Sequence, residues 1–435
     1  VEGGAPEWAA AGYTLFKGVN VPSKAFGEMV EHARHTPGID AAALKAMQDR
    51  GEDFVLLDGR TVAEYRKMNI PDGIACPNAE LGHRLPLLVP DETTPIVINC
   101  AGRTRSIMGA QSLIDLGFRN PVLALENGTQ GWQLAGFELE RGAARLYPES
   151  LGMAELAASR ERAAEFIAGH GIPVIDDATL RQWRGDADRS LYLLDVRTAE
   201  EFARSHQPGA VHAPGGQLVQ ATDQWVAVRN ARLVLMDDTN LRAAICAHWL
   251  RQMGHDAVVL GEDFSEMVGG GETEDPPSLS DISPESLATA LASGSAVLLD
   301  LNGGMAYRAN HIEGASWTIR PRLDRLDPPV GKPIVLTAPD RRLADAIAID
   351  LLEAGHREIS FLAGEEADWQ AAGLRLTATS NDPSDADCID YLFFVHDRHA
   401  GNLEACRQYL AWETGLIARM DAQEKGVFRV SRSEP

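Results

Sequence analysis

The most informative segment of the chain is Val97-Ile98-Asn99-Cys100-Ala101-Gly102-Arg103-Thr104-Arg105-Ser106. The apolar run at 95–98 predicts a short buried strand, and the apolar spacing at 107–116 predicts a helix. Cys100 therefore stands between a strand end and a helix start, where backbone N–H groups have no intrahelical partner. Because the helix dipole and the guanidinium groups of Arg103 and Arg105 add positive charge, we expect a lowered pKa for this thiol and a nucleophilic sulfur near neutral pH.

An ordinary buried cysteine is the alternative, since unpaired cysteines usually behave as small apolar residues. That alternative does not explain why Gly102, two arginines and Ser106 lie beside Cys100 at the junction. A glycine lets the backbone curl closely around an anion carried by the sulfur. We therefore favour a reactive cysteine, for which an electropositive setting is typical.

Three segments of the chain resemble the motifs of the rhodanese sulfurtransferases. The loop 100–106 resembles the active-site loop of that family. The segments that resemble its entry and closing motifs are Leu56-Leu57-Asp58-Gly59-Arg60 with Glu64-Tyr65, and Glu126-Asn127-Gly128 with Trp132, Ala135 and Gly136. Because the three motifs occur in the family's order, the resemblance is specific, and it implies a thiosulfate sulfurtransferase that forms a persulfide on Cys100.

Length and composition are typical of a soluble protein with several domains. The chain has 435 residues, of which 45% are hydrophobic and 24% charged. We expect a cytoplasmic protein without a membrane partner, since no apolar run is long enough to cross a bilayer and no secretory leader is visible. The net charge of −23 disfavours nucleic acid and anionic membranes as partners. Five scattered cysteines without CxxC pairs indicate a reducing compartment.

The chain repeats itself at an interval of 137 residues. The recurring pairs are Asp58 and Asp195, Arg60 and Arg197, Cys100 and Asp237, and Arg105 and Arg242. A further copy begins at Leu298-Leu299-Asp300 and ends in Gly364, Trp369, Ala372 and Gly373. The first sixteen residues resemble a closing motif alone, so we expect that an upstream rhodanese-like repeat is missing from this chain.

Each copy alternates short β-rich runs with helical patterns, which predicts an α/β fold. We expect tandem rhodanese-like domains, each a mainly parallel five-stranded sheet flanked by helices, plus a C-terminal α/β extension. The expected order is a closing fragment of an upstream repeat (1–16), a helical connector (17–38), the active domain (39–142), a second helical connector (143–172), an inactive domain (173–271), a linker (272–283), a second inactive domain (284–376) and the extension (377–435). Ligands of such sheets bind at the carboxyl ends of the strands, where Cys100 stands.

The extension contains two cysteines and two histidines, namely Cys388, Cys406, His396 and His399. Their spacing matches no known set of metal ligands, and packing explains their apolar and aromatic neighbours. We therefore expect no metal and no cofactor. We also expect a strand at 391–396, a helix at 402–422, and an extension that docks on the last domain or on a partner subunit.

One of the three copies keeps the nucleophile, because the residues at the position of Cys100 are Asp237 and Ala338 in the other two. Neither of these side chains can form a persulfide, so both copies are expected to be inactive. Cys246 follows the first inactive loop on the apolar pattern of a helix, and we expect it in the core.

The resemblance implies a sulfur transfer in two steps. The Cys100 thiolate takes the outer sulfur of thiosulfate or a related small anionic donor, and cyanide, a thiol or a protein thiol then accepts it. The residues expected to bind the persulfide, mainly through backbone N–H groups, are Ala101, Gly102, Arg103, Thr104, Arg105 and Ser106. Arg103 and Arg105 would attract the dianionic donor. Ser106 would either donate its hydroxyl or cap the following helix.

Asp58 and Arg60 are expected to support the loop. Arg60 would either lie near the rim of the site or pair with Asp58 or Glu64 to fix the loop after the strand. We favour the ion pair, because Arg197 persists at the equivalent position of an inactive copy.

Other functions stay open. The rhodanese fold resembles that of the cell-division-cycle phosphatases, whose Cys-x5-Arg loop cradles phosphate. The loop from Cys100 to Arg105 has the pattern Cys-x4-Arg, which is one residue shorter than that of the phosphatases. A shorter ring of amides leaves room for one sulfur rather than a phosphate. A further alternative is a sulfur carrier or scaffold whose inactive copies bind partners. The inactive copies could also serve as dimerisation surfaces, which would give a homo-oligomer.

Overall fold

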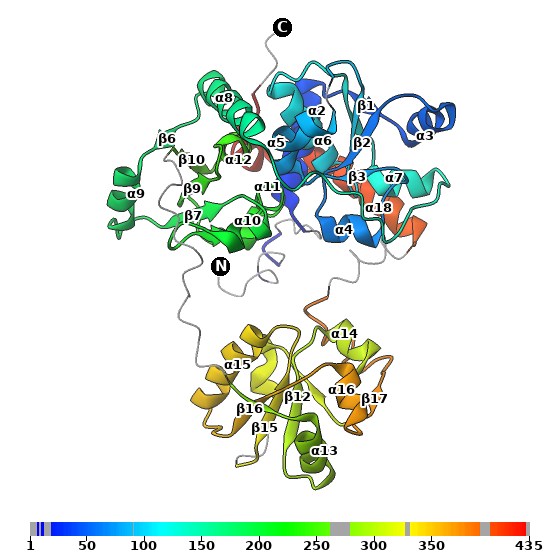
Figure 1. Ribbon diagram of the computed structural model, residues 1–435, viewed down its shortest axis with the longest axis vertical. Coiled ribbons are helices and arrows are strands. Elements are labelled where there is room, and N and C mark those ends of the chain that lie inside the picture. Colours follow the sequence, from blue (N-terminus) through cyan, green and yellow to red (C-terminus); the bar gives the residue numbers. More distant parts are fainter. Residues whose placement is uncertain are drawn as a thin grey trace. The chain divides into compact units, whose positions relative to one another are not determined.

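The computed structural model describes residues 7, 10–12, 19–89, 91–261, 279–326, 331–391 and 401–431. The chain forms two compact units, one of Val1–Gly271 with Asp397–Pro435 and one of Glu272–His396 (Figure 1). The expected closing fragment of an upstream repeat, 1–16, lies almost wholly outside the described residues.

The first unit contains two five-stranded parallel sheets of the same topology. The first, of order β1-β5-β4-β2-β3, consists of β1 (Gly38–Ile39), β2 (Val55–Asp58), β3 (Ile74–Ala75), β4 (Ile96–Asn99) and β5 (Val122–Leu125). The second, of order β6-β10-β9-β7-β8, consists of β6 (Val174–Ile175), β7 (Leu191–Asp195), β8 (Val211–His212), β9 (Arg232–Met236) and β10 (Asp256–Leu260). Their registers agree, since Asp58 is aligned with Asn99 and Asp195 with Met236.

The helices that join these strands also correspond between the two sheets. Those of the first sheet are α3 (Ala41–Arg50), α4 (Val62–Lys67), α5 (Asn78–Leu88), α6 (Thr104–Asp115) and α7 (Gly128–Leu134). Those of the second are α9 (Asp177–Arg184), α10 (Ala199–Arg204), α11 (Gly215–Gln220), the 3-10 turn η1 (Thr222–Gln224) and α12 (Leu241–Gln252). Equivalent side chains cap equivalent helices, with a capping box at Thr61 in α4 and at Thr198 in α10.

The two expected connectors each contain a helix that packs on a domain. Helix α2 (Val21–Arg34) packs against α6, and α8 (Met153–His170) packs against α12. The ring of Phe26 in α2 lies 6.0 Å from that of Trp249 in α12. One hydrophobic core therefore runs through both domains of the first unit.

The second unit repeats the same parallel order as β11-β16-β15-β12-β14. Its strands are β11 (Ser280–Ile282), β12 (Val297–Asp300), β14 (Ser316–Trp317), β15 (Ile334–Thr337) and β16 (Ile359–Leu362), with β13 (His311–Ile312) and β17 (Leu376–Thr377) as an antiparallel pair. Its helices are α13 (Pro284–Ala292), α14 (Gly304–Ala309), the 3-10 helix η3 (Arg320–Arg325), α15 (Arg341–Glu353) and α16 (Glu366–Ala371). The predicted tandem α/β fold with parallel five-stranded sheets is thus confirmed.

Two of the predicted domain boundaries lie elsewhere in the structure. Strand β11 lies inside the expected linker 272–283, yet its backbone pairs with β16, so it belongs to the sheet. The first part of the expected extension stays with the second unit, because Arg308 Nε donates a hydrogen bond of 2.7 Å to the carbonyl of Pro383 and Asp390 accepts one of 2.6 Å from the N–H of Gly304.

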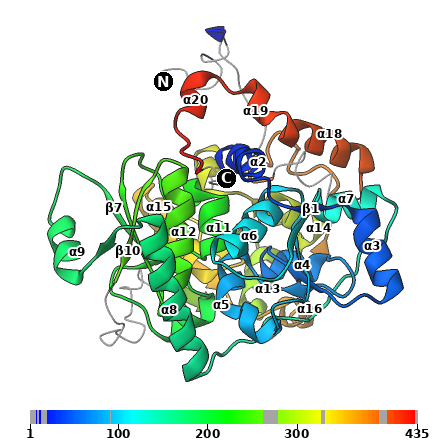
Figure 2. The same ribbon diagram turned by 90° about the horizontal axis from the view of Figure 1, so that it is seen from above.

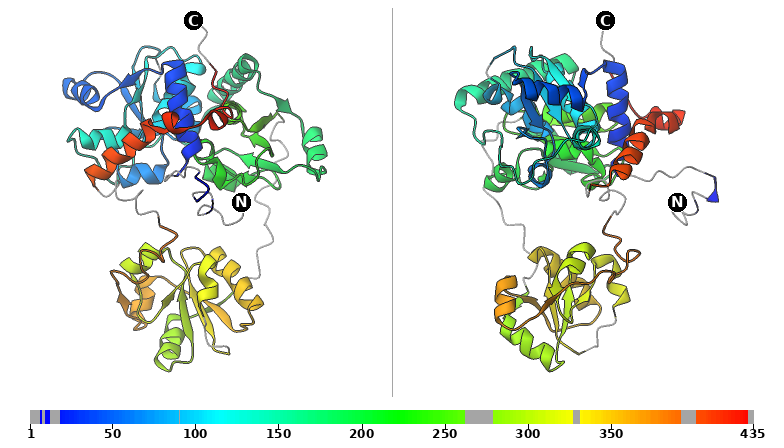
Figure 3. Two further views of the ribbon diagram at one scale, coloured as in Figure 1. Left: turned by 180° about the vertical axis from the view of Figure 1, so that it is seen from behind. Right: turned by 90° about the vertical axis from the view of Figure 1, so that its right-hand side faces the viewer.

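The rest of the extension belongs to the first unit. It forms α18 (Leu403–Thr414), α19 (Leu416–Arg419) and α20 (Ala422–Lys425) rather than one helix at 402–422. Met420 and Asp421 adopt extended backbone and separate α19 from α20. Helix α18 lies beside α7 and α2, and α19 beside α2 (Figures 2 and 3). The predicted docking on the last domain is therefore wrong for this part of the extension. The expected strand at 391–396 falls outside the described residues after Tyr391. None of the helices described here has the length and apolar character needed to cross a membrane.

Candidate functional site

Cys100 lies where the sequence placed it, directly after the central strand β4 and before α6. Parallel α/β sheets bind their ligands at the carboxyl ends of the strands. The thiol of Cys100 therefore lies at the edge of the sheet where small molecules bind. Only 2% of Cys100 is exposed. The thiol is thus central in the sheet and closed off from solvent.

The carbonyl groups of the loop are turned away from its centre by α7. The N–H of Thr129 donates to the carbonyl of Cys100 at 2.8 Å, and the N–H of Gln130 donates to that of Ala101 at 3.2 Å. Because a peptide group is planar and trans, the N–H that shares a peptide with each of these carbonyls points in the opposite direction to the carbonyl. Gly128 permits this approach, since an added Cβ would stand 2.2 Å from the Cys100 carbonyl oxygen. The closing motif therefore orients the amides of the active loop.

The first turn of α6 supplies further N–H groups. The helix begins at Thr104, and the N–H groups of its first turn have no carbonyl one turn earlier in the helix to accept them. Arg103 is the N-cap residue and makes no side-chain cap. Ser106 lies inside the first turn and is fully buried, so it does not cap the helix. Its hydroxyl makes no hydrogen bond with the described residues, and Ser106 lies close enough to Cys100 to lower the pKa of the thiol.

The predicted lowering of the Cys100 pKa is wrong for this closed arrangement. Burial raises the pKa of the thiol above its usual value, because a thiolate loses its hydration there. The charge of Arg105 and the neighbouring Ser106 act in the opposite direction without reversing the rise, and the carboxylate of Glu413 raises the pKa further. The sequence showed the positive groups and could not show the burial.

Both loop arginines are held by carboxylates. Arg103 pairs with Glu28 at 2.7 Å and with Glu31, both on α2. Arg105 donates from two nitrogens to Glu64, at 2.7 and 2.8 Å. Their charges are therefore partly neutralised, and the positive field at the loop is weaker than the sequence indicates.

Two helices outside the sheet cover the loop. On α2, Gly27 packs so closely that an added Cβ would stand 2.9 Å from the Thr104 side chain. On α18, Oε1 of Glu413 accepts a hydrogen bond of 2.9 Å from the Thr104 hydroxyl. Sequence reasoning missed Glu413 and the α2 carboxylates, because no local pattern announces a partner from so distant a segment.

Comparison with known proteins agrees with this geometry. Residues 40–135 and 176–268 match the Rhodanese-like domain family. The crystal structure of thiosulfate sulfurtransferase from Pseudomonas aeruginosa is 40% identical to this chain, with a TM-score of 0.84 over 100% of this chain and 83% of that one. The chain belongs to the rhodanese family. This rhodanese is also 30% identical, over 88 residues, to YrkF of Bacillus subtilis, a protein provisionally named a sulfur carrier. That match covers 20% of this chain and about half, 46%, of YrkF.

Asp58 and Arg60 form a buried ion pair rather than part of the rim of the rhodanese site. Arg60 is 1% exposed, donates to the Asp58 carboxylate at 2.6 and 2.9 Å, and also donates to the carbonyl of Met68 at 2.6 Å. Asp195 and Arg197 repeat this geometry in the second domain, with distances of 2.5 and 2.9 Å. A pair that persists beside an inactive loop fixes the chain after the strand.

The other two copies lack a sulfur at the position of Cys100. Asp237 is buried at the position of Cys100 and accepts hydrogen bonds from the backbone N–H groups of Thr239, at 3.2 Å, and Ala243, at 3.1 Å. A carboxylate thus occupies the cradle that serves the thiol in the active copy. In the third copy Ala338 directly follows β15 and offers no polar group.

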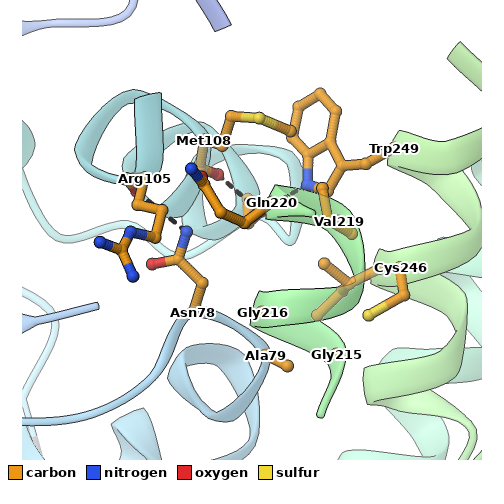
Figure 4. Close-up of a pocket in the computed structure, with 12 residues that line it drawn as sticks. Asn78, Ala79, Arg105, Met108, Gly215, Gly216, Val219, Gln220, Cys246 and Trp249 are labelled. Atoms are coloured by element: carbon orange, nitrogen blue, oxygen red, sulfur yellow. Dashed lines mark hydrogen bonds between the residues drawn. The ribbon is translucent and has the colours of Figure 1, made fainter. Parts of the chain in front are cut away.

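The interface behind the active loop is closely packed (Figure 4). The side chain of Asn78 donates to the carbonyl of Arg105 at 2.9 Å, and an added Cβ on Gly215 would stand 2.5 Å from the sulfur of Cys246. The cavity there measures about 20 Å³, little more than one water molecule needs. Cys246 is a core residue, as expected, and small molecules do not approach Cys100 from this side.

Cys388 and Cys406, the two cysteines of the expected extension, are buried in different units. The histidines His396 and His399 fall outside the described residues. Across the described ranges, no three or more His, Cys, Asp or Glu side chains are arranged so that they could hold a metal ion.

Proposed function

We propose that this rhodanese is a sulfurtransferase that carries a sulfane sulfur as a persulfide on Cys100. The observation that carries the proposal is the loop 100–106, in which one buried thiol ends the central strand and faces backbone N–H groups oriented by α7 and α6. Such oriented donors stabilise a small anion on the sulfur without reorganisation.

The first half-reaction charges the enzyme. The Cys100 thiolate attacks the outer sulfur of thiosulfate and forms a new S–S bond. The S–S bond of the donor breaks, and sulfite leaves with its electron pair. Cys100 then carries a persulfide anion, which the loop N–H groups hold. No oxidant or reductant is needed, because the sulfur moves without a net change in electrons.

The second half-reaction returns the enzyme to its starting state. Cyanide or a thiolate attacks the outer sulfur of the persulfide, and the S–S bond to Cys100 breaks. Its electron pair goes back to the Cys100 thiolate, while thiocyanate or an acceptor persulfide leaves. This sequence is covalent catalysis of the ping-pong type. Arg103 and Arg105 act by holding the loop through their carboxylate partners.

Intact mass measurement tests the proposal. After incubation with thiosulfate, the wild-type chain is expected to gain one sulfur atom, and cyanide is expected to remove it as thiocyanate. Cys100→Ser should gain none. Cys246→Ala is the matched control, because it removes another buried thiol, and it should behave as the wild type. Absence of added sulfur on the wild type would overturn the proposal.

A sulfur carrier is the second candidate, favoured by the similarity to YrkF and by the two copies without a cysteine nucleophile. A carrier passes its sulfur to a protein partner and turns over slowly with small molecules. Steady-state formation of thiocyanate from thiosulfate and cyanide distinguishes the two. Many turnovers per chain support the enzyme, whereas a single stoichiometric burst supports the carrier.

A further inference from the structure

A cavity of about 500 Å³ opens at the amino-terminal edge of the second parallel sheet. Arg189 precedes β7, Asn230 precedes β9 and Asp256 begins β10, so the loops that enter these strands form part of its wall. The rest of the wall comes from the last turns of α8 and α12 and from the segment after α20. No residue of the active loop 100–106 lines this cavity, which is therefore separate from the sulfur-transfer site.

Basic side chains dominate the wall of the cavity. They are Arg189, Arg251, Arg429, His170, His248 and His255, and the acidic residue among the lining residues is Asp256. Arg189 pairs with Asp256 at 2.7 Å. Arg251 donates to the carbonyl of Ala257 at 3.2 Å, but within the described part of the chain no carboxylate pairs with Arg251 or Arg429. Two positive charges are therefore left over, in a chain whose net charge is −23.

Helix capping explains only part of this arrangement. Basic side chains in the last turn of a helix stabilise its dipole, which accounts for His170 in α8 and Arg251 in α12. Arg429 lies after the last helix, and its N–H donates to the carbonyl of Gln252 at 2.7 Å. The N–H of Ser431 donates to Oε1 of Gln252 at 2.9 Å. The backbone of this C-terminal segment is therefore fixed against α12, which holds Arg429 at the cavity.

The groups next to the histidines do not make the cavity acidic. Oδ2 of Asp115 lies 3.6 Å from Nε2 of His248, but the same carboxylate pairs with Arg34. Burial lowers the pKa of His255, and the positive charge of Arg229 lowers it further. A neutral imidazole still donates one N–H, and the His255 ring has no hydrogen-bond partner among the described residues. Cations and N–H donors of this kind are the chemistry of an anion site.

We propose that this cavity binds a small oxyanion of the phosphate or sulfate class, with Arg251 of α12 and Arg429 of the C-terminal segment as its principal ligands. Its volume exceeds that of one phosphate group and lies in the ordinary range of ligand sites. The site therefore has room for a diphosphate. The proposal does not depend on the persulfide chemistry of Cys100.

Titration calorimetry with inorganic phosphate and with pyrophosphate, at low ionic strength, tests the proposal. Both anions are expected to bind one site per chain, and pyrophosphate more tightly, because it carries more charge. A hydrogen-bonded contact between an anion and an arginine contributes about tenfold in affinity. The double variant Arg251→Gln with Arg429→Gln should therefore bind about 100-fold more weakly. Cys100→Ser should bind as the wild type does, because the site lies outside the active loop.

Arg407→Gln is the matched control, because it removes the same charge from an exposed pair on α18, and it should leave both affinities unchanged. If the double variant does not fold, Arg429→Gln alone decides, since that side chain is exposed; a loss of about tenfold is expected. Binding of pyrophosphate without phosphate would assign the site to diphosphates. Absence of binding by the wild type, full affinity in Arg429→Gln, or loss of binding in Cys100→Ser would overturn the proposal.

Discussion

Arg105 and Arg242 make equivalent contacts across the interface between the first two domains. Nη1 of Arg105 lies 3.3 Å from Oε1 of Gln217 in the second domain, and Nη1 of Arg242 lies 2.9 Å from Oε1 of Glu80 in the first. Gln217 and Glu80 are separated by the same 137 residues as the two arginines. Each loop arginine therefore reaches the equivalent helix of the opposite domain, which gives the pair of domains a pseudo-twofold relationship.

The same correspondence holds within each domain. Arg105 pairs with Glu64 at 2.7 Å, and Arg242 pairs with Glu201 at 2.7 Å. The equivalent loop of the second copy has Asp237 in place of a cysteine and contains this arginine. We infer that the arginine is retained because it joins the loop to the domain interface, which an inactive copy needs as much as an active one.

Replacement of Arg242 is expected to destabilise the first unit strongly. Arg242→Met removes a fully buried cation and leaves the carboxylates of Glu80 and Glu201 without it. Breaking a buried ion pair in this way costs about 3–5 kcal/mol of unfolding free energy. Chemical denaturation followed by tryptophan fluorescence measures this change. Arg407→Met, at an exposed pair on α18, is the control and should change stability by about 0.5 kcal/mol or less.

The fold and the position of the nucleophile were predictable because both are encoded locally. The junction at Cys100 shows a strand, a glycine and a helix within a few residues, and the interval of 137 residues shows the repeat. The partners of Arg103 and Arg105 were not predictable, since the pairing depends on how separate helices pack. Glu413 contacts Thr104 across 309 positions of sequence. Burial by these helices reversed the predicted pKa shift of the thiol.

The pair of Arg105 and Glu64 makes stability depend on acid pH. Burial alone would raise the pKa of Glu64, but the charge and hydrogen bonds of Arg105 lower it from 4.5 to about 2. A carboxyl whose pKa is lower in the folded state stabilises fully above its unfolded pKa, and that contribution is lost as the pH falls from 4.5 toward 2. The melting temperatures of the wild type and Glu64→Gln should therefore differ at pH 7 and converge in acid. A difference that stays constant with pH would contradict this origin.

The reactivity of Cys100 should rise with pH over an unusually wide range. Burial raises the pKa of the thiol above 9.0, and only the thiolate reacts with iodoacetamide. The rate of Cys100 alkylation, followed by mass, is expected to increase through pH 9 without a plateau. In Glu413→Gln the curve should shift to lower pH, because one source of the raised pKa is removed. A plateau below about pH 8 in the wild type would show that the positive groups prevail over burial.

Comparing alanine variants of two glycines in the closing motif distinguishes the effect of backbone strain from the effect of a displaced active loop. Gly128 and Gly136 both have positive φ, of +52° and +84°, so alanine at either position costs about 1–2 kcal/mol. An added Cβ at Gly128 would stand 2.2 Å from the carbonyl oxygen of Cys100, whereas at Gly136 it meets nothing within 4 Å. Gly128→Ala must displace the active loop, and misplacement of reacting groups by about 1 Å lowers rates by about 10²-fold.

We therefore expect Gly128→Ala to lose persulfide formation while Gly136→Ala keeps it at similar stability. The measurement is the rate of sulfur addition to Cys100 in both variants, with the melting temperature as the check on folding. Equal rates in the two variants would mean that the carbonyl contacts of α7 do not set the loop. A selective loss in Gly128→Ala would tie the closing motif directly to the orientation of the N–H groups that face the Cys100 sulfur.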